Sequence, residues 1–91
     1  MEQEKNQYYV TRGVNHIVPP PVIALMIEMA MEVEDKDYLQ VFRVIAKDGF
    51  SVIKLTQEVP AYEKSVKISW VPEHSLKMFL MNNTLLLSSE Y

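Results

Sequence analysis

The chain contains no cysteine among its 91 residues, which excludes disulfide bridges, thiolate metal sites and thiol nucleophiles. Glycine is nearly as scarce: Gly13 and Gly49 are the only two, and isolated glycines do not make a glycine-rich phosphate-binding loop. No apolar run approaches the roughly 20 residues that a membrane-spanning helix needs. Residues 1–7 are polar and acidic, unlike a secretory signal peptide. These absences predict a cytoplasmic protein that does not span a membrane.

Clusters of basic side chains are missing as well. The chain has 9 Lys and Arg against 12 Asp and Glu, a formal net charge of −3, so we expect no nucleic-acid partner. What is present, 48% hydrophobic and 23% charged residues, is the composition of a folded domain. A chain of this length has room for one hydrophobic core. The sequence therefore predicts a disordered N-terminus at residues 1–6 and a single α+β domain at residues 7–91.

The first half of the chain predicts one strand and one helix. Residues 8–14 combine aromatic and β-branched side chains that favour a strand, and Gly13 ends the pattern. A triple proline follows, and its last member suits the first turn of a helix. Apolar residues then recur at a spacing of three to four, which predicts one long helix over residues 21–34.

The second half predicts strands. Residues 38–46 and 50–59 read as a hairpin around Asp48-Gly49, and residues 66–70 alternate as a further strand. Residues 73–87 fit either a hairpin around Asn82-Asn83 or a short helix at their start, and we favour the hairpin. The predicted fold is α+β, an antiparallel sheet of about five to six strands with the helix at residues 21–34 packed on one face. In the first hairpin, Phe42 should face Leu55 and Val44 should face Ile53 in the core.

The apolar stripe of the predicted helix is too broad for one sheet face. Ile27 and Met31 extend it beyond the roughly 100° that a core-facing helix needs. We expect these two residues to form an interaction surface, for a homodimer or another protein partner. A rival apolar strip on the sheet carries Arg43 and Lys54, and the C-terminal segment offers an alternative cover for the helix within one chain.

The titratable residues lack catalytic patterns. His16 and His74 have no matched partner in the sequence, and we expect both to be exposed loop residues. The acidic run at the end of the predicted helix lacks the ligand spacing of a calcium loop. We therefore predict no catalytic residue, no metal and no cofactor.

Two function classes remain from the residues themselves. The first is a small non-enzymatic protein-interaction (binding) module, favoured by surplus apolar surface, adaptable methionines and the lack of a reactive group. The second is a small enzyme or ligand-binding protein with a pocket near Arg12, Glu58 and Tyr62. A cross-strand ion pair between Arg12 and Glu58 is a structural alternative to that pocket.

Several short segments resemble a family of short uncharacterised proteins of Gram-positive bacteria and their mobile elements, domain of unknown function 960. The likeness lies in Tyr9-Val10-Thr11-Arg12-Gly13, Asp37-Tyr38-Leu39-Gln40-Val41-Phe42, Gln57-Glu58-Val59-Pro60-Ala61-Tyr62 and the closing Glu90-Tyr91. An acidic turn and a helix tryptophan typical of that family are replaced here. The resemblance implies a bacterial cytoplasmic protein, and it carries over no catalytic residue.

Overall fold

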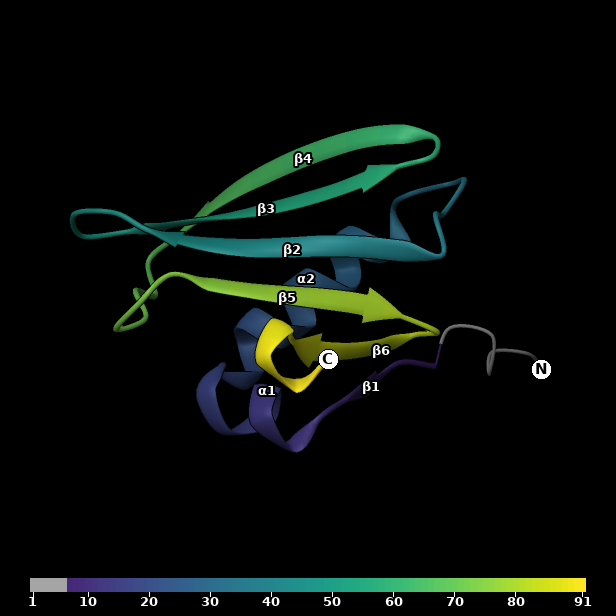
Figure 1. Cartoon of the computed structure of the whole chain (residues 1–91). Coiled ribbons are helices and arrows are strands. Elements are labelled where there is room, and N and C mark those ends of the chain that lie inside the picture. The colour runs from purple at the N-terminus through teal and green to yellow at the C-terminus, as the bar shows by residue number, and fades with distance from the viewer. Residues whose placement is uncertain (1–6) are drawn as a thin grey trace.

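A computed structural model describes residues 7–91 of the chain (Figure 1). The predicted disorder of residues 1–6 lies outside these described residues. The elements, in chain order, are β1 (Tyr9–Val10), α1 (Arg12–Ile17), α2 (Pro20–Met31), β2 (Leu39–Ala46), β3 (Ser51–Glu58), β4 (Ala61–Ile68), β5 (Leu76–Met81), β6 (Thr84–Leu87) and the 3₁₀ turn η2 (Ser88–Glu90). The chain is thus a small α+β domain, as the sequence predicts.

The six strands form one sheet in the order β1-β6-β5-β2-β3-β4. All neighbouring pairs are antiparallel except β1 and β6, which run parallel. The prediction of a purely antiparallel sheet is therefore wrong, and the sheet is mixed. The strand expected over residues 8–14 ends at Val10, because Thr11 caps α1 with its side-chain oxygen and accepts a hydrogen bond from the Val14 N–H at 3.3 Å.

The predicted long helix is shorter than expected. α2 has 12 residues and ends at Met31, and α1 is a second helix that the sequence patterns did not indicate. The prolines at the start of α2 occupy positions whose backbone N–H would have no partner within the helix. Beyond Met31 the chain carries several acidic side chains, which the negative end of the helix dipole disfavours, so the helix stops there.

The central hairpin, β2 with β3, has the predicted register. Phe42 pairs with Leu55 and Val44 pairs with Ile53. Gly49 has a φ of +88°, the left-handed conformation that its position in the turn requires. The C-terminal segment is also a hairpin, in which Asn82 (φ 51°) and Asn83 (φ 61°) make the turn between β5 and β6. Positive φ at both central residues is typical of a type I′ turn, which asparagine tolerates.

One hydrophobic core lies between the inner face of the sheet and the two helices. Phe42, Val44, Ile53 and Leu55 are fully buried there, which confirms their predicted role. Val14 from α1 and several residues of α2 complete the core. Figure 1 shows α2 running behind the sheet and the short turn η2 in front of β6, so the face turned toward the viewer, which we call the outer face, has no α-helix over β2, β3 and β4.

Candidate functional site

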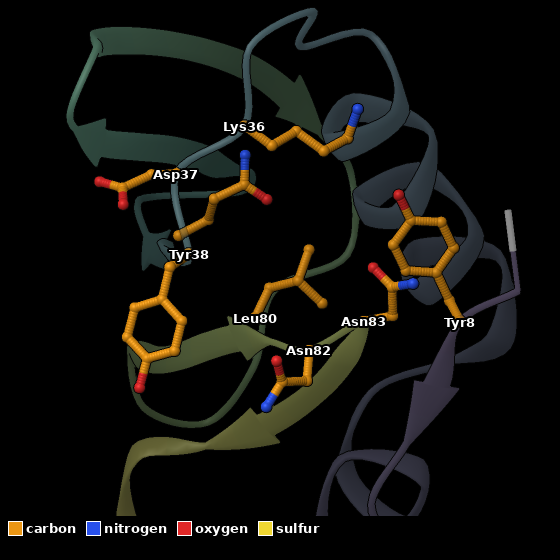
Figure 2. A pocket seen from close by; sticks show the side chains of 8 residues that line it. Tyr8, Lys36, Asp37, Tyr38, Leu80, Asn82 and Asn83 are labelled. Carbon is orange, nitrogen blue, oxygen red and sulfur yellow. The ribbon is translucent and has the colours of Figure 1, made fainter. Parts of the chain in front are cut away.

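A polar hollow of about 280 Å³ lies where the chain enters β2 (Figure 2). Its wall combines the segment before β2 with the turn between β5 and β6. The lining residues are Tyr8, Lys36, Asp37, Tyr38, Gln40, Leu80, Asn82 and Asn83. Partial burial raises the pKa of the Tyr8 phenol, which therefore stays neutral at physiological pH.

The polar side chains behind this hollow are bound to one another. Gln57 of β3 accepts hydrogen bonds from the Gln40 amide at 2.8 Å and from the Asp37 N–H at 3.0 Å. Its own amide nitrogen donates to the carbonyls of Asp35 and Pro60, both at 2.9 Å. The buried Gln57 side chain thus uses both its donors and both acceptor positions inside the fold.

The Asp37 carboxylate closes the same network. Its Oδ2 accepts from the Val59 N–H at 3.0 Å and from the Glu58 N–H at 3.2 Å. These backbone hydrogen bonds, that from Val59 first, hold the pKa of Asp37 below its ordinary value. A carboxylate kept ionised by backbone donors is a poor general base. The role of this cluster is structural, because its hydrogen bonds join the start of β2 to the end of β3.

The outer face presents a different set of side chains. Alternation along the strands places apolar residues there from four strands. These residues, all half-buried, are Leu39, Val41, Ile45, Val52, Phe79, Met81 and Leu86. A shallow hollow of about 440 Å³ crosses part of this face between the start of β2 and the end of β3.

A row of positive charges crosses the middle of the outer face. Arg43 of β2 pairs with Lys77 of β5 on one side and with Lys54 of β3 on the other. Lys54 contacts Glu63 of β4, with 3.2 Å between Nζ and Oε2. Like charges directly opposite one another in a sheet are destabilising, and only the Lys54 end of this row meets a carboxylate among the described residues. The outer face is therefore basic at its centre although the whole chain is acidic.

A third cluster joins the C-terminus to α1. The Glu90 carboxylate accepts hydrogen bonds from the Thr11 hydroxyl at 2.6 Å, the Leu87 N–H at 2.9 Å and the Gly13 N–H at 3.2 Å. These bonds, with Thr11 as the largest contributor, lower the pKa of Glu90. The ring of Tyr91 packs edge-on against Phe79, with centroids 5.5 Å apart.

The structure does not bring the predicted pocket residues together. Arg12 begins α1, which packs beside β6, whereas Glu58 and Tyr62 lie on β3 and β4 at the other side of the sheet. The Glu58 backbone N–H contributes to the Asp37 network, and Tyr62 lines a separate hollow beside Pro60. The ion pair expected between Arg12 and Glu58 is excluded by the same separation across the sheet.

The predicted interaction residues on α2 differ in exposure. Ile27 is half-buried and packs against the core, while Met31 is 46% exposed. Both histidines are exposed as predicted, although His16 belongs to α1 and not to a loop. The sequence patterns gave no signal for the Asp37 and Glu90 clusters, since their partners lie far away in the chain.

Within residues 7–91, no group of three or more His, Asp or Glu side chains has an arrangement that could hold a metal ion. The helices described for this chain are all too short or too polar to cross a membrane.

The comparisons with known proteins show the fold only. No family model and no curated protein matches the chain. Its structure is similar to the crystal structure of a protein of unknown function from Enterococcus faecalis, with a TM-score of 0.75 and alignment over 98% of this chain and 93% of that chain. The sequence identity is 17%, so the likeness concerns the fold. The family resemblance noted from the sequence stays a prediction.

Proposed function

We propose that this chain is a non-enzymatic protein-interaction module whose outer sheet face binds an acidic, partly apolar segment of a partner protein. The observation that carries the proposal is the row of Lys77, Arg43 and Lys54 between half-buried apolar side chains on a sheet face that α2 does not cover. A sheet face that presents partly exposed apolar side chains beside charged ones is a candidate interaction site.

The charge row specifies the chemistry of the partner. Three neighbouring cations repel one another, and Glu63 neutralises only the Lys54 end. Carboxylates of a bound segment would relieve this repulsion, and they would approach over a surface from which water is displaced by apolar contacts. The helix surface at Ile27 and Met31 is the weaker candidate, since Ile27 is already half-buried against the core.

An enzymatic role has less support. The carboxylates of Asp37 and Glu90 are occupied by hydrogen bonds from the fold, and their pKa values are lowered, so both remain deprotonated. The residues expected to form a pocket, Arg12, Glu58 and Tyr62, lie on elements at different ends of the sheet.

Selection from a random peptide library displayed on phage tests the proposal. We expect the immobilised protein to select peptides rich in Asp, Glu and large apolar residues, with binding that weakens as salt rises. Arg43→Glu should weaken binding of a selected peptide at least roughly tenfold, because it replaces an attraction at the centre of the face with a repulsion. Lys36→Glu is the matched control, since Lys36 lines the polar hollow and does not belong to the cationic row, and it should change binding little.

Two results would contradict the proposal. One is the selection of basic or neutral peptides, or of none. The other is tighter binding of a fluorescent oligothymidylate than of the selected peptides, which would assign the cationic row to single-stranded nucleic acid.

A further inference from the structure

We infer that two copies of this chain pair through the free edge of β4 and form one continuous sheet across a twofold axis. β4 has eight residues and ends the sheet, opposite the short strand β1 at the other edge (Figure 1). Its partner on one side is β3, so along its other side the backbone N–H and C=O groups of alternate residues point away from the sheet. Such an edge is a template for another strand.

Backbone geometry limits how two β4 strands can meet. In an antiparallel pair, both residues of a facing pair must direct their backbone groups toward each other or both away. These groups alternate along β4, so facing residues must be an even number of positions apart in the sequence. The twofold axis must therefore set one central residue opposite its own copy. The choice among the remaining registers then depends on the side chains.

Only the register centred on Ser65 pairs opposite charges. It places Glu63 opposite Lys67 of the partner subunit, and the twofold axis repeats this pair. Registers centred on Glu63, Lys64 or Lys67 place a charged residue opposite its own copy. The register centred on Val66 pairs no opposite charges, and in both this register and the one centred on Ser65 Lys64 faces an apolar residue of the partner subunit. Charge complementarity therefore selects a second copy of this chain in one register.

An apolar groove beside β4 supports the same register. The groove, about 390 Å³, lies between the first turns of α2 and the end of β4. It is lined by Pro19, Pro21, Val22, Leu25, Ile68, Ser69 and Trp70. The pairing centred on Ser65 puts Tyr62 of the partner subunit opposite Ile68, at the rim of this groove. Tyr62 is half-buried against its own core, so its ring adds apolar surface at the rim of the partner's groove and does not fill it.

This dimer forms through the edge of β4 and goes beyond the proposed function, although Glu63 also contacts Lys54 of the cationic row. An axis perpendicular to the sheet leaves both outer faces on the same side of a continuous sheet. It also differs from a dimer through α2, because Ile27 and Met31 take no part in it.

Sedimentation equilibrium at micromolar concentration tests the inference. We expect the wild-type chain to sediment at about 21 kDa, twice the 10.6 kDa of one chain. Glu63→Lys should raise the dimer dissociation constant at least roughly tenfold, because it sets two like-charged pairs in place of two opposite-charged pairs. The double variant Glu63→Lys with Lys67→Glu exchanges the charges and should restore the wild-type dissociation constant. Far-UV circular dichroism of each variant checks that the fold is retained, as expected for exposed positions.

Controls separate this edge from the other surfaces. Met31→Glu on α2 and Arg43→Glu on the outer face should leave the dimer intact. A wild-type monomer would overturn the inference, and so would a dimer that is insensitive to Glu63→Lys, that is not restored by the charge exchange, or that is lost in Met31→Glu. Each of these results leaves peptide selection by the outer face unaffected, so the two proposals fail separately.

Discussion

At three positions of this chain, backbone conformation or a close neighbour restricts the residue type. A Cβ at Gly13 would lie 2.5 Å from Oε2 of Glu90, so a side chain there would displace that carboxylate. Gly49 has open space around it, so its requirement comes only from its φ of +88°. Asn83 takes a left-handed conformation that asparagine tolerates better than most residues. The Asp-Gly pair in the sequence predicts the turn that requires Gly49. The contact at Gly13 could not be predicted in this way, because it involves a residue 77 positions away.

Substitution of Gly49 tests the constraint that comes from its positive φ. Gly49→Val should lower the free energy of unfolding by more than about 1 kcal/mol, because a β-branched side chain is strained at positive φ. Gly49→Asn is the matched control and should cost less, since Asn82 and Asn83 adopt the same region in this fold. Urea unfolding of the three proteins measures the difference. Equal stability of the valine variant and wild type would show that the turn changes its conformation at little cost.

Glu90 gives stability a dependence on pH. Its pKa is lower in the folded chain than in the unfolded chain, mainly through the Thr11 hydroxyl, so its contribution is fully present above the unfolded value and is lost as pH falls through the folded value. Unfolding followed from pH 7 to pH 3 should therefore show stability decreasing in the acidic range below the ordinary glutamate pKa of about 4.3. Glu90→Gln should flatten that decrease in part, leaving the share that belongs to Asp37, whose pKa is also lowered. An unchanged pH profile in Glu90→Gln would contradict this role.

Sequence patterns predicted correctly those helices and strands whose stabilising contacts lie close together in the chain. The β2–β3 and β5–β6 hairpins follow from turn residues and alternation within a few positions. α1 does not, because residues 8–14 have strand-like side chains and the helix is fixed by the Thr11 cap together with Glu90. The parallel pairing of β1 with β6 likewise joins the two ends of the chain. The hydrogen-bond clusters of Asp37 and Glu90 were not predicted either, because their partners are 21 and 79 positions away in the chain.

The central hairpin should be the element on which stability depends most. Phe42 is fully buried between neighbouring strands and the helix layer, so Phe42→Ala should cost about 3 to 5 kcal/mol of unfolding free energy. That is comparable with the whole stability of a small domain. Phe79→Ala, on the half-buried outer face, is the matched control and should cost clearly less. Thermal unfolding of both variants measures the contrast, and similar melting temperatures would contradict the assignment of inner and outer faces.

The whole molecule has a centre of strands with neighbours on both sides and a corner held by contacts between residues near the start and the end of the sequence. β2 and β3 lie inside the sheet, with neighbours on both sides. The corner formed by β1, β6 and α1 depends on a two-residue strand, a six-residue helix and the carboxylate of Glu90. A helix that short is not stable alone in water. Thr11 and Gly13 meet Glu90 at this corner.

Removal of residues 88–91 should therefore loosen the corner and leave the centre intact. Amide hydrogen exchange of the truncated chain is expected to be faster at Asn15 and Val18, whose N–H groups bond to Thr11 and Val14, because the bonds from Glu90 to the start of α1 are lost. The amides that join β2 to β3 should exchange as in the full chain. Val14 and Val18 remain buried in the core, so partial opening of α1 is expected and not its complete detachment. Equal exchange at Asn15 in both chains would show that core packing alone holds α1. Acceleration throughout β2 and β3 would show that the corner and the centre unfold as one cooperative unit.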